Sequence, residues 1–161
     1  MGFDLGIEKR NFPLRYFSLR KSPKKIVHWL NQLTMKQKFE LQYLLKTSPK
    51  VLESKISTPY GLAEWFCDDV YLKDGIYHFL WENVEEQAVL LEQKNNRYIR
   101  FQWLEDQENG LDTYFEISTM ADSITNEITL TIQDFCAPEE RQNSIMLWQQ
   151  QIGNLKRLIG S

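Results

Sequence analysis

"PEERQNSIMLWQQQIGNLKRLIG", residues 138–160, is the segment from which the fold follows. It begins with Pro138 and two glutamates and ends with Lys156 and Arg157 before Gly160, which are typical signals for the start and the end of a helix. Large apolar side chains recur between these ends at spacings of three and four residues: Ile145, Trp148, Ile152, Leu155 and Ile159. The pattern predicts a long amphipathic helix with all five side chains buried, so another layer must cover that face.

The preceding residues predict that the other layer is a β-sheet. From Met35 onward, Phe39, Leu41, Tyr43 and Leu45 alternate with polar residues, which is strand periodicity. Residues 127–135 alternate in the same way. The pairs at 74–75 (Asp-Gly) and 95–96 (Asn-Asn) predict tight turns between antiparallel strands. With "EDQENG" (105–110) interpreted as a polar loop, about six consecutive strands follow the first one.

Two short helices are predicted between the first strand and the others. Ser48-Pro49 and Thr58-Pro59 each place a hydroxyl at an N-cap and a proline at the first helical position. The first helix is expected to run to about Ser57. Its buried side chains are expected to be Val51, Leu52 and Ile56, and the second helix is expected to bury Leu62, Trp65 and Phe66 on one face. Asp68 and Asp69 are interpreted as residues that cap or end the second helix and solvate the rim of any cavity.

This order of elements predicts an α+β helix-grip fold, in which a curved antiparallel sheet of about seven strands wraps around the C-terminal helix. The chain resembles the START-like (SRPBCC) superfamily, and within it the bacterial START-like domains related to heat-shock chaperone ATPase activators. The resemblance covers residues 36–160. It rests on "SPKVLESKISTPYGLAEWFCDDV" (48–70), "GIYHFLWE" (75–82), "IRFQW" (99–103), "TYFE" (113–116), "LTIQDF" (130–135) and "LWQQQIGNLKRLIG" (147–160).

Charge divides the chain into two regions. Residues 1–34 carry seven basic and two acidic residues, a net charge of +5, whereas residues 35–161 carry 12 basic and 20 acidic residues, a net charge of −8. We therefore predict a START-like domain over 35–161. Residues 1–34 are either an extension upstream of the true start at Met35 or a natural basic tail, and we expect them to be poorly ordered or loosely attached. An acidic domain repels phosphate backbones, so nucleic acid is not an expected partner.

Composition also bears on location. No window of the sequence has the length and hydropathy of a membrane span, and the first residues lack the order of a secretory signal. Cys67 and Cys136 are expected to be free, buried thiols. These features predict a cytoplasmic protein, either a monomer or a weak dimer.

The resemblance implies a ligand cavity between the sheet and the long helix. Members of the superfamily include lipid carriers, hormone receptors, polyketide cyclases and chaperone activators, so the fold alone does not select an activity. The residues at this position are large, which predicts a narrow cavity or none. The predicted ligand-binding residues are Trp65, Phe66, Tyr77, Phe79, Trp81, Phe101, Trp103, Phe115, Trp148 and Ile152, and Ile99 is expected to face the same space.

Catalytic chemistry has weaker support in the sequence. No nucleotide-binding, zinc or hydrolase motif is present, so no cofactor, metal site or catalytic residue is predicted. His78 lies between Tyr77 and Phe79, so it is expected on the opposite face, at a surface or edge position. We therefore predict a non-catalytic binding module, for a small hydrophobic molecule or as an accessory protein-interaction domain. The alternative is a cyclase- or hydrolase-like enzyme acting on an apolar substrate in the same cavity, with Tyr77, His78 or Asp69 transferring protons.

Overall fold

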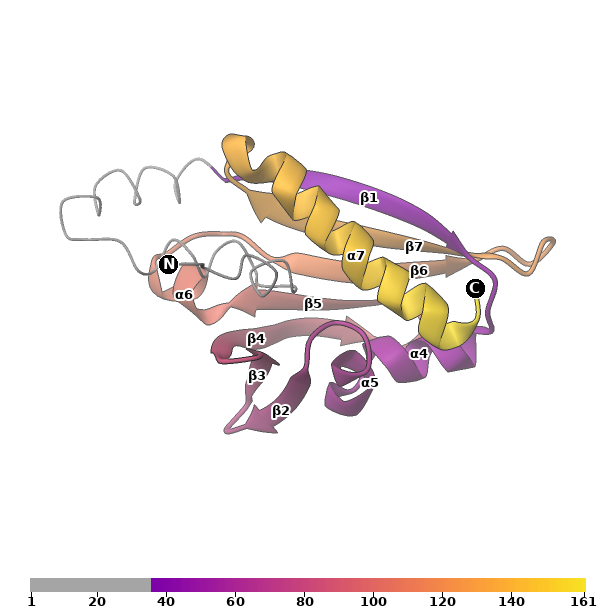
Figure 1. Cartoon of the computed structure of the whole chain (residues 1–161), viewed down its shortest axis with the longest axis horizontal. Coiled ribbons are helices and arrows are strands. Elements are labelled where there is room, and N and C mark those ends of the chain that lie inside the picture. The colour runs from indigo at the N-terminus through magenta and orange to yellow at the C-terminus, as the bar shows by residue number, and fades with distance from the viewer. Residues whose placement is uncertain (1–35) are drawn as a thin grey trace, which may run out of the picture.

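A seven-stranded antiparallel sheet and a long C-terminal helix form two layers (Figure 1). The computed structural model describes residues 36–161. The strands are β1 (Gln37–Leu45), β2 (Asp69–Lys73), β3 (Ile76–Trp81), β4 (Val84–Lys94), β5 (Tyr98–Trp103), β6 (Phe115–Ala121) and β7 (Ile128–Cys136). The helices are α4 (Pro49–Ile56), α5 (Pro59–Ala63), α6 (Leu104–Glu108) and α7 (Arg141–Ile159), with a 3₁₀ turn at Pro138–Glu140 before α7.

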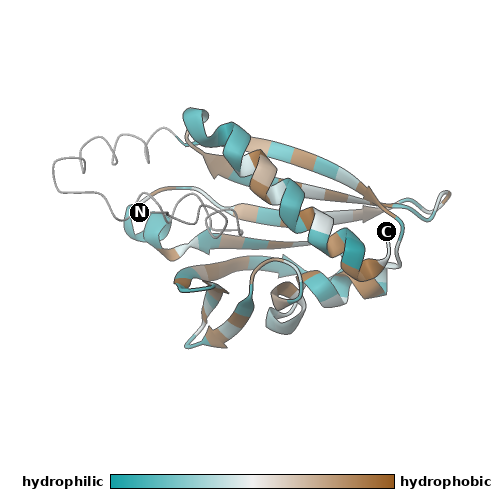
Figure 2. Ribbon diagram, in the orientation of Figure 1, coloured by the Kyte–Doolittle hydropathy of each residue, from teal (hydrophilic) through white to brown (hydrophobic). Residues whose placement is uncertain are grey.

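The predicted helix-grip fold is confirmed. The strands lie in the order β1-β7-β6-β5-β4-β3-β2, so β2 to β7 form a meander and β1 pairs with β7. Helix α7 crosses one face of the sheet, and α4 and α5 lie at one end (Figure 1). Apolar and polar residues alternate along α7 and along the strands (Figure 2), as expected when only one face of each element is buried.

The tight turns form where the sequence predicts them. Asp74 and Gly75 have φ values of 51° and 79° and join β2 to β3, and Asn96, with φ of 56°, lies between β4 and β5. These residue types tolerate positive φ, so the turns set the strand register locally. The turn between β3 and β4 has no such residue at its first position, where Glu82 adopts a φ of 49°.

Both predicted helix caps are confirmed. The Ser48 hydroxyl accepts a hydrogen bond from the Val51 amide at 3.2 Å, and the Thr58 hydroxyl accepts one from the Gly61 amide at 3.0 Å. The prediction that Val51 is buried is wrong, because α4 packs through Leu52 and Ile56 and leaves Val51 exposed.

The second helix is shorter than predicted. Helix α5 ends at Ala63, so Trp65 and Phe66 lie in the turn that follows it. Their amides still donate to the Leu62 carbonyl, at 3.3 and 2.9 Å, and both side chains are buried. Trp65 therefore keeps a core position outside the helix, and so does Phe66.

The prediction of a polar loop over 105–110 is wrong for residues 105–108. These residues lie in helix α6, whose Asp106 is buried. The Asp106 carboxylate accepts hydrogen bonds from Lys36 Nζ at 2.8 Å and from the Thr113 hydroxyl at 2.6 Å. This long-range network anchors the short helix, and sequence spacing does not reveal it.

Helix α7 also differs in detail from the prediction. It begins at Arg141, after the 3₁₀ turn at Pro138–Glu140, and Gly160 caps it in the left-handed conformation with φ of 74°. Trp148, Ile152 and Leu155 are buried, whereas Ile145 and Ile159 are only partly buried. The predictions for residues 1–34 lie outside the described residues.

Candidate functional site

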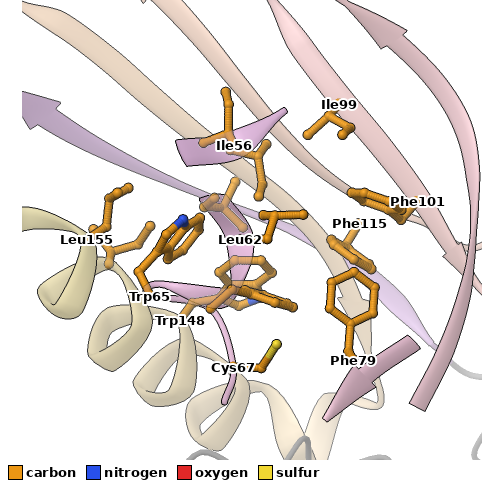
Figure 3. Close-up of a cluster of buried hydrophobic side chains, with 14 of the residues drawn as sticks. Ile56, Leu62, Trp65, Cys67, Phe79, Ile99, Phe101, Phe115, Trp148 and Leu155 are labelled. Carbon is orange, nitrogen blue, oxygen red and sulfur yellow. The ribbon is translucent and has the colours of Figure 1, made fainter. Parts of the chain in front are cut away.

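The ten residues predicted to bind a ligand gather between the sheet and α7, where all ten side chains are buried. We call them the interlayer cluster: Trp65, Phe66, Tyr77, Phe79, Trp81, Phe101, Trp103, Phe115, Trp148 and Ile152. They come from the turn after α5, from β3, β5 and β6, and from α7. Figure 3 draws several of them together with Cys67 and the neighbouring aliphatic side chains. Alternation along the strands places them together, because every second residue faces α7.

Phe66 is at the centre of this cluster. Its ring centroid lies 5.3 Å from that of Phe79, 5.7 Å from Trp81, 5.8 Å from Phe115 and 5.6 Å from Trp148. Aromatic rings at these distances are in direct contact. Side chains therefore fill the space around Phe66, and a ligand there would have to displace some of them.

Most polar groups within the cluster have partners. Trp65 Nε1 donates to the Lys55 carbonyl at 2.9 Å, and Trp148 Nε1 donates to Asp134 Oδ2 at 2.8 Å. Trp81 differs, because its Nε1 is buried and finds no acceptor within residues 36–161. Since a buried N–H without an acceptor costs about 1–3 kcal/mol, Trp81 is the place where an added acceptor would be most favourable.

Two titratable side chains on the inner side are held in their neutral forms. Burial raises the pKa of the Cys67 thiol to about 12, and this thiol donates to the Asp69 carbonyl at 3.2 Å. Burial also raises the pKa of Tyr77 above its ordinary value. Cys67 is therefore protonated at neutral pH, as is Tyr77, and both are poorly suited to transfer protons there.

His78 lies on the opposite face of the sheet from Tyr77, as predicted, but it is neither at an edge nor exposed. Strand β3 lies between β2 and β4, and 9% of His78 is accessible. Its ring stacks on Tyr71 with centroids 4.4 Å apart, and its Nδ1 lies 2.5 Å from Glu85 Oε1. The hydrogen bond from His78 lowers the pKa of Glu85 below its ordinary value. Cross-strand neighbours thus cover this histidine.

The helix-capping interpretation of Asp68 and Asp69 is wrong. Asp68 Oδ2 accepts from the Glu82 amide at 2.6 Å, in the turn between β3 and β4, and Asp69 Oδ1 accepts from the Val70 amide at 2.9 Å. Asp69 is exposed on β2 while Tyr77 is buried against α7. The groups considered for proton transfer, Tyr77, His78 and Asp69, are therefore not brought together in one site.

Glu86, a buried acidic residue on the inner face, was not predicted from the sequence. It pairs directly with Phe79 in the register of β3 and β4, so both side chains point toward α7. Strand alternation could have placed it there, because Glu86 lies two residues before Ala88 in the same strand and therefore on the same face. A pocket of about 320 Å³ opens beside this position and is lined by Glu85, Glu86, Gln87, Trp103, Leu104, Glu105 and Glu108. Since Trp103 also belongs to the interlayer cluster, this pocket adjoins the interior.

Two further findings concern the described part of the chain. No set of three or more His, Cys, Asp or Glu residues in 36–161 is arranged to hold a metal ion. None of the helices in that range combines the length and hydropathy that a bilayer span requires.

Comparisons with known proteins agree with the fold. A solution structure of a Bacteroides fragilis protein is 36% identical over 77% of this chain and 91% of its own, with a TM-score of 0.55. The Aha1 dimer of Colwellia psychrerythraea shares 13% identity over 76% of this chain and 96% of its own, with a TM-score of 0.64. CalU16 of Micromonospora echinospora shares 12% identity over 77% and 76%, with a TM-score of 0.58.

The two distant similarities, to Aha1 and CalU16, show the fold alone. No protein of curated function matches the sequence. The model of the START-like superfamily domain matches residues 33–161. The chain therefore belongs to the START-like superfamily.

Proposed function

We propose that this START-like domain is a non-catalytic binding module for a small hydrophobic molecule held between the sheet and α7. The observation that carries the proposal is Trp81 Nε1, a buried donor without an acceptor in residues 36–161, surrounded by aromatic side chains. An apolar site with one polar orienting group is the usual composition of a small-molecule pocket. The ligand would be apolar and would carry one oxygen that accepts from Trp81.

The pocket beside Trp103 provides a route for this ligand. The rings of Trp81 and Trp103 have centroids 6.4 Å apart, and Trp103 forms part of the pocket wall. Movement of Trp103 would join the pocket to the interlayer cluster. Glu86 lies on the same wall and disfavours a negatively charged ligand, so neutral molecules fit this route better than fatty-acid anions.

Native mass spectrometry of freshly purified protein tests the proposal. We expect a retained small molecule in the wild-type protein and about five- to tenfold lower occupancy in Trp81→Phe, which loses the donor but keeps an aromatic ring. Tyr43→Phe is the matched control: its hydroxyl is also buried without a hydrogen-bond partner in residues 36–161, but it lies on β1, outside the interlayer cluster, so its loss should leave occupancy unchanged. Wild-type protein without any bound molecule, and without a thermal shift when neutral apolar compounds are added, would refute the proposal.

A second candidate is an accessory protein-interaction domain, as in the chaperone-activator branch. The support is surface chemistry: Tyr71 and Leu72 expose apolar area on the edge strand β2. The enzyme alternative has less support, because Tyr77 and His78 face opposite sides of the sheet. Two buried, free cysteines, Cys67 and Cys136, support a cytoplasmic location as part of the proposal.

A further inference from the structure

Strand β2 has an unpaired edge with apolar side chains beside it. Among the strands of residues 36–161, it is the last in the sheet order and pairs with β3 alone. Four of its five residues are exposed, and the accessible fractions of Tyr71 and Leu72 are 39% and 52%. An exposed strand edge is a template for another strand, so a second chain could extend the sheet here.

The register of the β2–β3 hairpin determines which backbone groups point outward. The two-residue turn at Asp74 and Gly75 makes Lys73 and Ile76 the closing hydrogen-bonded pair. By alternation, Val70 and Leu72 direct their N–H and C=O groups toward the free edge. The bond from the Val70 amide to the Asp69 side chain, at 2.9 Å, agrees with this orientation.

The side chains of β2 are complementary to their own copy. In an antiparallel pair centred on Tyr71, Asp69 lies opposite Lys73 of the second copy, and Lys73 lies opposite Asp69 of the second copy. Val70 and Leu72 then meet as the hydrogen-bonded pairs. A two-fold axis therefore places opposite charges together at both ends and exposed apolar surface at the centre.

We propose that the β2 edge binds the β2 edge of a second copy, giving a weak symmetric dimer with one continuous sheet. On pairing, the Val70 amide donates to Leu72 of the second copy in place of Asp69 Oδ1. The Asp69 carboxylate is then released to bind Lys73 of the second copy. The edge is five residues long, so the buried area is far below that of a stable dimer and the association is weak.

Sedimentation equilibrium of the full chain, at about 10 µM to 1 mM, tests this dimer. Lys73→Glu places two acidic groups together at each end, so we expect at least about tenfold weaker association. The double swap Asp69→Lys with Lys73→Glu restores opposite charges and should return the dissociation constant to within about threefold of wild type. Lys38→Glu is the matched control: it makes the same charge change at an exposed position of β1, the other edge strand, and should leave association unchanged.

A further variant keeps the test decisive if the double swap does not fold. Leu72→Pro removes an amide that points to the free edge and leaves the ladder with β3 intact, so the monomer should fold and the dimer should be lost. The dimer is refuted by a wild-type protein that stays monomeric throughout the range. It is also refuted if Leu72→Pro associates as wild type does, or if Lys38→Glu weakens association as much as Lys73→Glu.

Discussion

Gly61 is the residue at which the close approach of α4 and α5 depends on a missing side chain. A Cβ built there would overlap the Ser54 carbonyl oxygen and would lie 2.8 Å from Lys55 Cα. Both contacts are with backbone, which cannot rotate away as a side chain can. Glycine is therefore required here by packing, and its φ plays no part.

We predict that Gly61→Ala lowers the free energy of unfolding by about 2 to 3 kcal/mol, because α5 must move away from α4. Gly153→Ala is the control: an added Cβ meets open space on α7, and the better helix former should raise the free energy of unfolding by up to about 1 kcal/mol. Urea unfolding of both variants measures the difference. Equal stabilities would mean that the two short helices pack less closely than described.

At the scale of elements, α7 joins the interlayer cluster mainly through Trp148. This side chain contacts Phe66 and Phe115, with centroids 5.6 and 6.2 Å away, and donates to Asp134 on β7. It therefore links the helix to the sheet and to the turn after α5. The same helix presents Met146 to solvent.

We expect Trp148→Ala to cost about 3 to 5 kcal/mol of unfolding free energy, since it leaves a large cavity and removes the indole N–H that donates to Asp134 Oδ2. Met146→Ala removes an exposed side chain from the same helix and should change stability by less than about 0.5 kcal/mol. Thermal and urea unfolding compare the two. A small effect of Trp148→Ala would show that α7 is held by other contacts.

At the scale of the whole molecule, the question is whether residues 36–161 suffice for folding. The Lys36 ammonium group binds the buried Asp106, so the described domain is anchored from its first residue. Its sheet and α7 form one core within this range.

We predict that a protein beginning at Met35 melts within a few degrees of the full chain. Differential scanning calorimetry of both proteins measures the shift. Substitution of Lys36 by Met in the shortened protein is the contrast: it removes the ammonium group that binds the buried Asp106 carboxylate and should lower the melting temperature further. A large loss on truncation alone would make residues 1–34 part of the folded domain.

The extent of prediction from sequence follows the range of each interaction. Features that depend on neighbours within a few residues could be predicted. They are the periodic spacing of apolar residues, the helix caps at Ser48 and Thr58, and the turns at Gly75 and Asn96. The same periodicity identified every member of the interlayer cluster as buried. The same alternation also indicates that Glu86 faces inward, although this was not predicted.

The sequence by itself determined the order of the strands and of the helices other than α6, the burial of one face of each, and the family. Only the tertiary structure decided that Asp68 caps a distant turn, that Asp106 anchors α6, and that Tyr71 and Glu85 cover His78. It alone brought Trp81 beside Trp103 and left β2 at the edge of the sheet. The physical reason is that these contacts join residues whose proximity arises from strand register and layer packing, which local propensity does not encode.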